Sequence, residues 1–252
     1  MAVTVKTKRE IELMREANHR LEKVFDALGS MIRPGISTWD IDQAARELIS
    51  EQGGIPNFLN YDGFPGAICT SVNEEVVHGI PKKERILREG DIISLDCGLI
   101  LNGYHSDAAR TYPVGKIAEP EQRLIEVTRA AFFEGIRYAT AGRHLHEIGN
   151  AIGDFCESRG YGVVRDLVGH GIGRKLHEDP QIPNFHQKRR GPKLYKNMTL
   201  AIEPMFNIGR PDVAWLEDDW TVVTKDGRPS AHYENTILIT DGEPEILSKT
   251  HD

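Results

Sequence analysis

The chain has 252 residues, of which 39% are hydrophobic and 27% charged, and its formal net charge is −7. This composition is typical of a globular protein with its own hydrophobic core, and the negative charge disfavours a nucleic-acid binder, which needs a basic surface. No apolar run approaches the roughly 20 residues of a membrane span, and the N-terminus lacks the apolar stretch of a secretory signal. We therefore expect a cytoplasmic protein with no membrane partner and no specific recognition of a nucleic-acid sequence.

Two amphipathic helices are predicted at the start of the chain. Thr7 and Glu10 have the spacing of a capping box, and apolar residues recur at helical period from there to Gly29, where the first helix should end. A second helix is predicted over residues 37–52, before a pair of glycines. Strands are then predicted at 67–72, 91–100 and 104–114.

An Asn-Gly dipeptide joins the last two of these strands and is typical of a tight hairpin turn. In that register Asp96 lies opposite Ala109 and Asp107 opposite Gly98, so both carboxylates project from one face, about 7–8 Å apart or less. Such a pair is able to share a ligand, and buried carboxylates without a partner are costly. The alternative is that Asp107 caps a turn and Asp96 pairs with an arginine such as Arg110.

The organisation of the first half recurs later in the chain at a constant offset of 107 residues, where Gly35–Gly53 aligns with Gly142–Gly160. We interpret this as a weak internal duplication. It predicts one domain over 1–252, with pseudo-symmetric halves at about 7–114 and 115–248 and a pocket where the halves meet. The alternative is that any two amphipathic helices that stop at glycine look alike.

The second half is predicted to contain one helix ahead of the repeated one and two strand-like segments. The helix covers residues 119–139, and an apolar run at 198–207 is strand-like. Residues 220–240 are predicted to form a hairpin with its turn near Asp226 and Gly227.

Polar residues interrupt several of these apolar segments. His170 lies between glycines, Glu203 ends the run Leu-Ala-Ile-Glu, and Glu234 stands at the start of an apolar strand. Each has an ordinary structural explanation by itself, but with Asp96 and Asp107 they supply four carboxylates and one imidazole, which is the inventory of a metal site. Two divalent ions neutralise four carboxylates, whereas one leaves an excess of negative charge. The oxygen-rich set favours Mn(II), Fe(II) or Co(II), and zinc stays open.

Competing catalytic motifs are absent from the sequence. The stretch GHGIG is similar to part of a dinucleotide fingerprint but lacks the strand, turn and helix that this motif requires. There is no GxxxxGK[ST], GxSxG or HExxH. The corresponding nucleotide-binding, serine hydrolase and zinc protease classes therefore lose their main support.

Five longer stretches resemble one known family. They are SVNEEVVHGIP, DIISLDCGLILNGYHSDAARTYPVG, GHGIGRKLHEDPQIPN, AIEPMF and DGRPSAHYENTILIT. Through them the chain resembles the type I methionine aminopeptidases over nearly its whole length. The resemblance implies an α+β pita-bread fold, in which two pseudo-symmetric α/β halves surround a curved antiparallel sheet with the metal site at its centre. The length leaves no room for the large insertion of the type II enzymes or for the zinc-finger extension of some type I enzymes, so a bare catalytic domain is expected.

The resemblance also implies roles for individual residues. Two divalent ions (Mn, Fe(II), Co or Zn) would be bound by Asp96, Asp107, His170, Glu203 and Glu234, with Asp107 and Glu234 bridging them. The catalytic residues would be His78, His177 and Glu203. The pocket for the methionine side chain would be lined by Tyr61, Phe64, Cys69 and Trp220, beside His78 and His177. Asn73 and Ser230 match positions that bind a structural Na or K ion in family members.

The implied reaction removes an N-terminal methionine from peptides and nascent proteins whose second residue is small. Hydroxide held between the two ions would attack the scissile carbonyl, and Glu203 would take the proton of the water. His177 would donate a hydrogen bond to the developing oxyanion, while His78 would contact the amide nitrogen of the second residue. Nascent chains as substrates imply ribosome association. The basic segment 186–196 is a candidate surface for it, with a solvated segment as the alternative. We expect a monomer.

Three positions depart from the family pattern. An aromatic residue is common in place of Leu176, and glutamine and histidine are common in place of His232 and Asn235. These changes affect the shape of the pocket or the surroundings of the metals, and none removes a ligand.

Two rival functions are compatible with the same fold. The first is an X-Pro aminopeptidase or dipeptidase, although such enzymes usually carry an additional N-terminal domain for which this chain has no room. The second is a non-catalytic pita-bread binding protein. Such a protein is expected to have lost one or more ligands, whereas all five are present here.

Overall fold

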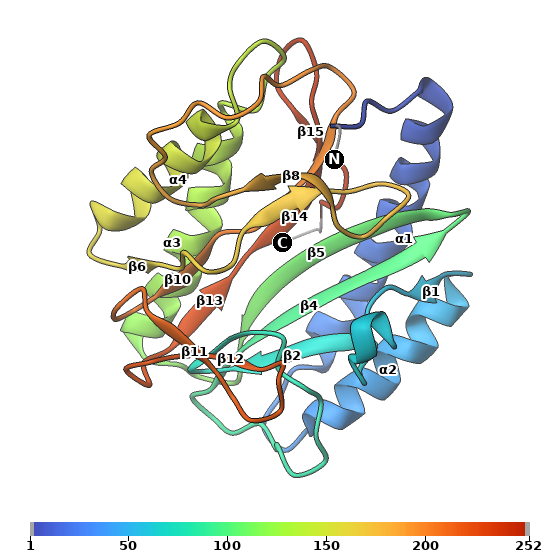
Figure 1. The fold of residues 1–252 in the computed structure, drawn as a ribbon. Coiled ribbons are helices and arrows are strands. Elements are labelled where there is room, and N and C mark those ends of the chain that lie inside the picture. The colour runs from blue at the N-terminus through green and yellow to red at the C-terminus, as the bar shows by residue number, and fades with distance from the viewer. Residues whose placement is uncertain (1–2, 250–252) are drawn as a thin grey trace.

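A curved sheet with helices on one side forms the framework of the protein (Figure 1). The structure is a computed structural model and describes residues 3–249. The helices are α1 (Lys8–Met31), α2 (Thr38–Glu51), α3 (Glu119–Ile136) and α4 (His146–Glu157), with a 3₁₀ turn η1 (Tyr61–Gly63). The predicted helices are thereby confirmed, and the mixture of helices with an antiparallel sheet confirms the α+β class.

The main sheet has nine strands in the order β1-β4-β5-β14-β9-β7-β8, with β2 paired to β4 and β15 paired to β14. These strands are β1 (Ile55–Pro56), β2 (Ile68–Val72), β4 (Ile92–Leu101), β5 (Tyr104–Pro113), β7 (Gly169–Gly171), β8 (Glu178–Ile182), β9 (Thr199–Ile202), β14 (Glu234–Leu238) and β15 (Glu245–Ile246). Every pairing in the sheet is antiparallel.

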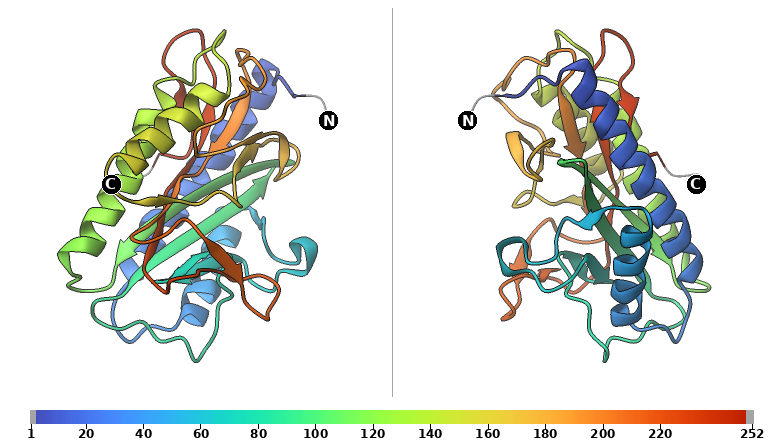
Figure 2. Two further views of the ribbon diagram at one scale, coloured as in Figure 1. Left: turned by 60° about the vertical axis from the view of Figure 1, so that its left-hand side comes forward. Right: turned by 90° about the vertical axis from the view of Figure 1, so that its right-hand side faces the viewer.

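Two small sheets flank the main one. The first is β13-β10-β6, built from β6 (Gly162–Val163), β10 (Met205–Asn207) and β13 (Ser230–His232). The second is β11-β12-β3, built from β3 (Glu75–Val77), β11 (Val213–Trp215) and β12 (Val222–Thr224). The side views show the four helices on one face of the molecule and the short strands and loops on the other, so that one face of the sheet is free to hold a site (Figure 2).

The first helix starts as predicted and ends later than predicted. The capping box is present, with the backbone N–H of Glu10 donating to Thr7 Oγ1 and the backbone N–H of Thr7 donating to the Glu10 carboxylate. Gly29 does not end the helix, which continues to Met31. A Cβ at position 29 would lie 2.9 Å from Cε1 of Tyr112 on β5, so this glycine permits close packing of α1 on the sheet.

The predicted hairpin of residues 91–114 is confirmed, and the hairpin predicted over residues 220–240 is wrong. β4 and β5 pair with Asp96 opposite Ala109 and Gly98 opposite Asp107. Over residues 220–240 there is a turn at Gly227, whose N–H donates to the Thr224 carbonyl, but the segments on either side of this turn enter different sheets.

The two segments diverge because their hydrogen-bond partners lie elsewhere in the chain. Pro229, just before β13, has no N–H for a hairpin ladder. Its carbonyl accepts from the N–H of Ile208, and the N–H of Ser230 donates to the Asn73 carbonyl at 2.8 Å. The strand-like run 198–207 is likewise divided, since β9 and β10 belong to different sheets on either side of Glu203 and Pro204.

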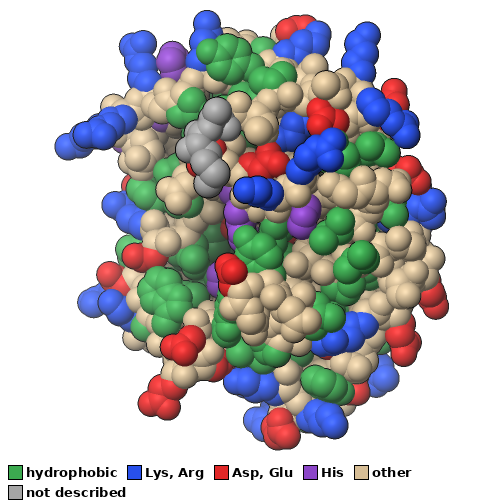
Figure 3. Space-filling model, turned by 45° about the vertical axis from the view of Figure 1, so that its right-hand side comes forward, with side chains coloured by type: hydrophobic (Ala, Val, Ile, Leu, Met, Phe, Trp, Pro, Cys, Tyr) green, Lys and Arg blue, Asp and Glu red, His purple; other side chains and the backbone are tan. Residues whose placement is uncertain are grey.

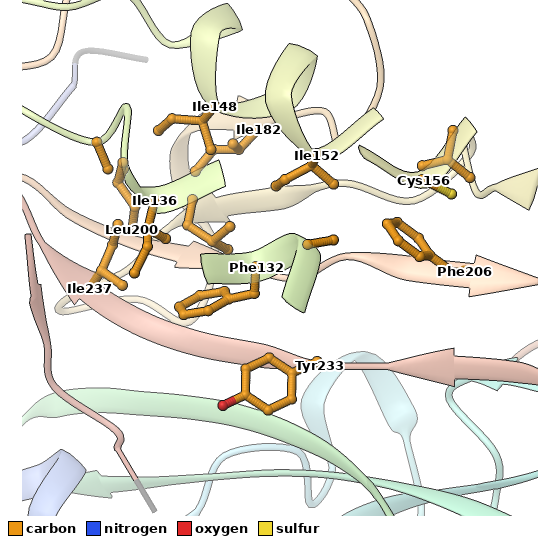
Figure 4. Packing of buried hydrophobic residues seen from close by; sticks show 14 of the residues in the cluster. Phe132, Ile136, Ile148, Ile152, Cys156, Ile182, Leu200, Phe206, Tyr233 and Ile237 are labelled. Carbon is orange, nitrogen blue, oxygen red and sulfur yellow. The ribbon is translucent and has the colours of Figure 1, made fainter. Parts of the chain in front are cut away.

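Each pair of helices covers its own layer of core. Phe132 on α3, Ile148 and Ile152 on α4, and Phe206 and Tyr233 from the strand side meet in one cluster (Figure 4). A second cluster joins α1 and α2 to β2, β4 and β5. The order of two helices followed by strands occurs in each half, while the internal duplication itself stays a prediction.

Two further features bear on the expectations from composition. Within residues 3–249, no helix combines the length and apolar character needed to cross a membrane. Cys69, Cys97 and Cys156 are all buried and free.

Candidate metal centre

The register of three neighbouring strands brings three carboxylates together. Asp96 on β4 is opposite Ala109 on β5, and Ala109 is opposite Glu234 on β14. Asp107 lies two residues before Ala109, and alternate residues of a strand share a face. Asp96, Asp107 and Glu234 therefore project from the same face of the sheet, with the small Ala109 between them.

The other two predicted ligands come from the adjoining strands. His170 on β7 is opposite Ala201 on β9, and Glu203 follows directly after β9. Nε2 of His170 lies 3.6 Å from Oε1 of Glu203 and 3.8 Å from Oδ2 of Asp107. Ligand atoms of Asp107, His170 and Glu234 all lie within 4.8 Å of one another. The five residues thus come from five strands or strand ends and line one cavity.

The ionised forms of the four carboxyl groups in this cluster are destabilised. Burial raises the pKa of Asp96 to about 7. Burial and then the neighbouring carboxylates raise the pKa values of Asp107 and Glu234 well above their ordinary range, and burial with the charge of Asp96 does the same for Glu203. These four groups are stable together as anions only with a cation among them.

His170 is held in the form that binds metal ions. Burial lowers its pKa to about 3, so the ring is neutral and its short distances to carboxylates are not ion pairs. Nδ1 lies 2.9 Å from the carbonyl of Gly171 and is placed to donate to it. The lone pair of Nε2 is therefore directed at the carboxylates, which is the usual arrangement of a metal-binding histidine.

The predicted ligands are suited to binding divalent cations. Buried oxygens of Asp96, Asp107 and Glu234 have no hydrogen-bond partner within the described residues, and buried polar atoms are normally paired. Arg110 lies on the other face of the sheet, where its guanidinium donates to the carbonyl of Glu234 and to Oδ1 of Asn235. The alternative that Asp96 pairs with Arg110 is therefore wrong.

One cavity of about 280 Å³ contains this cluster. The predicted pocket residues Tyr61, Phe64, Cys69, His78, His177 and Trp220 all line it, together with Asp96, Asp107, His170, Glu203 and Glu234. Figure 3 shows histidine side chains in a hollow of this face, with hydrophobic side chains beside them. Trp220 lies edge-on to Phe64, with ring centroids 5.2 Å apart. The cavity therefore has an apolar wall opposite a charged floor.

Two neutral histidines stand at the edge of this cavity. His78 adopts a left-handed backbone conformation (φ 58°), and burial lowers its pKa to about 4. His177 lies between β7 and β8, where burial also lowers its pKa. Its ring is 4.5 Å from the ring of His170, and its Nδ1 is 2.8 Å from the hydroxyl of Tyr61. Both histidines are available as neutral hydrogen-bond donors.

The predicted monovalent cation residues lie together but do not line this cavity. The N–H of Ser230 donates to the carbonyl of Asn73 at 2.8 Å. The side chain of Asn73 is engaged locally, donating to Asp91 and accepting from the N–H of Ile92. A cation at this place would have to use backbone carbonyls.

The three departures from the family pattern have different surroundings. Leu176 lines the cavity. His232 is 1% exposed, neither of its ring nitrogens has a partner within residues 3–249, and its Nε2 is 3.9 Å from Oε2 of Glu203. Asn235 accepts from Arg110 and from the hydroxyl of Ser248 on the other face.

Several residues that line the cavity were not predicted from the sequence. They are Phe58, Asp62, Val77, Leu167, Val168 and Met205. Met205 is two residues after Glu203, and Phe58 and Asp62 flank Tyr61 in one loop. Proximity to a predicted residue was the only available signal, because apolar residues of a pocket wall have the same sequence pattern as the core.

The chain is similar to known metallopeptidases. Metallopeptidase family M24 matches residues 12–241. A methionine aminopeptidase of Clostridium acetobutylicum is 51% identical over 246 residues, which cover 98% of each chain. The structure of a methionine aminopeptidase from Thermotoga maritima has a TM-score of 0.96 at 44% identity and covers 98% of this chain and 100% of that chain.

A more distant structure shares the fold alone. The Xaa-Pro dipeptidase of Bacillus anthracis has a TM-score of 0.80 at 24% identity, and the match covers 98% of this chain and 62% of that chain. The expected pita-bread fold is thereby confirmed. With this fold, a full-length relationship at 51% identity and a buried cluster of acidic residues and histidine, the chain belongs to metallopeptidase family M24 and, within it, to the methionine aminopeptidases.

Proposed function

We propose that this metal-dependent aminopeptidase removes the N-terminal methionine from peptides and nascent proteins whose second residue is small. One observation carries the proposal: a single cavity combines an apolar wall, including Phe64, Cys69 and Trp220, with the cluster of four carboxylates and His170. An apolar, partly sulfur-lined wall suits a flexible thioether. The charged floor suits peptide hydrolysis assisted by metal ions.

The proposed cofactor is a pair of divalent ions bound by Asp96, Asp107, His170, Glu203 and Glu234. Four carboxylates balance the charge of two such ions, and the unpartnered buried oxygens support the binding of cations at this place. Mn(II), Fe(II), Co(II) and Zn(II) all suit this ligand set. Such ions, when bound, lower the pKa of a water and polarise a carbonyl group.

Three residues of the chain are proposed to handle protons and developing charge. Glu203 takes the proton of the attacking water, since its carboxylate lines the cavity beside the other proposed ligands. His177 donates a hydrogen bond to the oxygen of the scissile carbonyl. His78 contacts the amide nitrogen of the second residue. Both histidines are neutral at pH 7 because burial lowers their pKa values.

The proposed specificity has two parts. The cavity volume of about 280 Å³ is at the small end for ligand pockets, so one side chain and a short length of peptide fill it. The preference for a small second residue is inferred from the resemblance to the methionine aminopeptidases, with steric exclusion near His78 and His177 as its proposed cause.

Peptide hydrolysis by metal-stripped protein, with each divalent ion added back in turn, tests this proposal. We expect release of methionine from a peptide that begins Met-Ala, much slower release from Met-Leu, and no cleavage of Ala-Pro. Asp107→Asn should abolish the activity, whereas Asp154→Asn, a matched change of an exposed aspartate, should not. Cleavage of Ala-Pro alone would point to the X-Pro peptidases, and no cleavage with any ion would point to a binding protein.

We further propose that the chain acts as a monomer in the cytoplasm and docks on ribosomes through the basic segment 186–196. In that segment Lys188, Arg189 and Arg190 are exposed. Binding of this kind should be sensitive to salt, since it neutralises RNA phosphates. Replacement of the three residues by glutamate should abolish cosedimentation with ribosomes while leaving hydrolysis of short peptides intact. Equal cosedimentation of the variant would contradict this role.

Two more sequence-based hypotheses are retained as proposals. The chain is taken as one catalytic domain over 1–252, with halves at about 7–114 and 115–248. Asn73 and Ser230 are proposed to bind Na or K through backbone carbonyls, and their mutual hydrogen bond supports a common location. Thermal unfolding in Na, K and a bulky organic cation checks the second point, because a bound ion raises the unfolding temperature.

A further inference from the structure

The hydroxyl of Tyr61 lies 2.8 Å from Nδ1 of His177. The two rings are edge-on, with centroids 5.3 Å apart. They come from separate loops, one following β1 and the other between β7 and β8. The hydrogen bond therefore links two segments across the edge of the cavity that both residues line.

The backbone around Tyr61 is shaped to present this side chain. Its neighbours Asn60 (φ 63°) and Asp62 (φ 48°) both have left-handed conformations. Asparagine and aspartate are the residues other than glycine that most readily adopt such conformations. Two hydrogen bonds close the loop, from the N–H of Asn60 to the carbonyl of Phe64 and from the N–H of Tyr61 to the carbonyl of Phe58. A residue held this firmly is suited to positioning a neighbour.

The direction of the hydrogen bond decides where the ring of His177 carries its proton. Within residues 3–249 the Tyr61 hydroxyl has no acceptor other than Nδ1. A neutral imidazole has one N–H. If the phenol donates to Nδ1, the ring proton must be on Nε2. In the reverse arrangement Nε2 has no hydrogen and is unable to donate to a substrate oxygen. The first arrangement is favoured because it pairs the hydroxyl hydrogen of Tyr61 with its one acceptor among the described residues.

We propose that Tyr61 is a positioning residue for the peptidase reaction, whose hydroxyl fixes the Nε2–H tautomer of His177 and holds that N–H toward the scissile carbonyl. The inference rests on the proposed function and deepens it, because it assigns the hydroxyl of Tyr61 a task beyond lining the pocket. Tyr61 acts through His177 and does not itself touch the reacting atoms.

Nitrogen NMR of the metal-free protein at neutral pH tests the tautomer directly. The His177 signals are assigned by their absence in His177→Ala. We expect Nδ1 to have the chemical shift of an unprotonated ring nitrogen and Nε2 that of a protonated one. In Tyr61→Phe both signals should move toward a mixture of tautomers. A wild-type ring protonated on Nδ1, or signals that do not change in Tyr61→Phe, would overturn the proposal.

A double-mutant cycle tests whether Tyr61 acts through His177. Loss of an orienting hydrogen bond should lower kcat about 10-fold in Tyr61→Phe, with KM for a Met-Ala peptide changed about 2-fold or less. His177→Ala should lower kcat about 100-fold, as expected for loss of an oxyanion donor. Addition of Tyr61→Phe to His177→Ala should then have almost no further effect. Additive losses, or a change in KM alone, would show that Tyr61 only binds methionine.

Tyr104→Phe is the matched control. It also removes one phenol hydroxyl, which donates to Oε1 of Glu10 at 2.8 Å and does not line the cavity. The His177 signals and kcat should be the same as in the wild type. If the wild type released no methionine with any ion, the proposed function would fail, and the NMR result would still report the tautomer independently.

Discussion

Metal binding to this protein should release protons, because burial raises the pKa values of the carboxyl groups that receive the ions. The pKa values of Asp107, Glu203 and Glu234 are well above their ordinary range, and that of Asp96 is about 7. Ligands must be deprotonated to bind, so loading the ions near neutral pH should release protons. Apparent affinity should fall as the pH is lowered, since protons then compete more strongly.

Calorimetric titration of the metal-free protein with Mn(II) measures the number of protons released. The titration is repeated in buffers of different ionisation enthalpy. The observed binding enthalpy depends linearly on the ionisation enthalpy of the buffer, and the slope is the number of protons released. Asp96→Asn removes the group that titrates nearest pH 7, so its slope should vary less with pH around neutrality than that of the wild type. A slope indistinguishable from zero would refute the inference that these carboxyl groups have raised pKa values until cations bind.

The raised pKa values of these carboxyl groups also predict an unusual dependence of protein stability on pH. A carboxyl whose pKa is raised on folding binds more protons in the folded state, so its contribution to stability is lost as the pH rises. For Asp96 this loss should run from about 4, the usual pKa of an aspartate, to about 7. Metal-free protein should therefore melt at a lower temperature at pH 8 than at pH 5, and bound ions should remove the difference. Equal melting temperatures for the metal-free protein would contradict the reasoning.

Three further substitutions probe the framework. Gly98→Ala places a Cβ 2.3 Å from the carbonyl oxygen of Ser106 and should cost about 1–3 kcal/mol by urea denaturation, whereas Gly242→Ala, which meets no atom within 4 Å, should be neutral. Glu10→Gln weakens the capping box and should cost about 1 kcal/mol at pH 7. The pKa of Glu10 is lowered to about 2, mainly by the backbone N–H of Thr7. The wild type should therefore be more stable than Glu10→Gln above about pH 4.5, and this difference in the free energy of unfolding should disappear toward pH 2. A difference that does not change with pH would contradict this prediction. Phe132→Ala empties a fully buried site and should cost about 3–5 kcal/mol, and a loss below about 1 kcal/mol would mean that the core collapses around the gap.

Local features of the sequence were sufficient where the structure depends on near neighbours. The capping box at Thr7 and Glu10 and the register of β4 and β5 were both predicted correctly. The capping box joins residues three positions apart, and the register is set by the two-residue turn at Asn102 and Gly103, so local spacing determines both. The ligand types were also readable, because charged residues are unusual inside apolar strands.

The failures have a common origin in contacts between distant segments. Gly29 has the pattern of a helix stop, but it serves close packing against Tyr112. The hairpin over 220–240 has a suitable turn, yet the strand after Pro229 pairs with β10, which no local pattern indicates. A glycine or a turn signal describes a local conformation and does not identify the packing partner.

The order and spacing of residues were enough to predict the helices, the β4–β5 hairpin, the candidate ligand types and the family. The arrangement of the site required the folded chain. Ala109 is between Asp96 and Glu234 only because three strands pair in one register. The raised pKa values of the carboxyls come from burial, and the hydrogen bond from Tyr61 to His177 joins residues 116 positions apart. Such properties follow from distance and burial in space, which the order of residues along the chain does not specify.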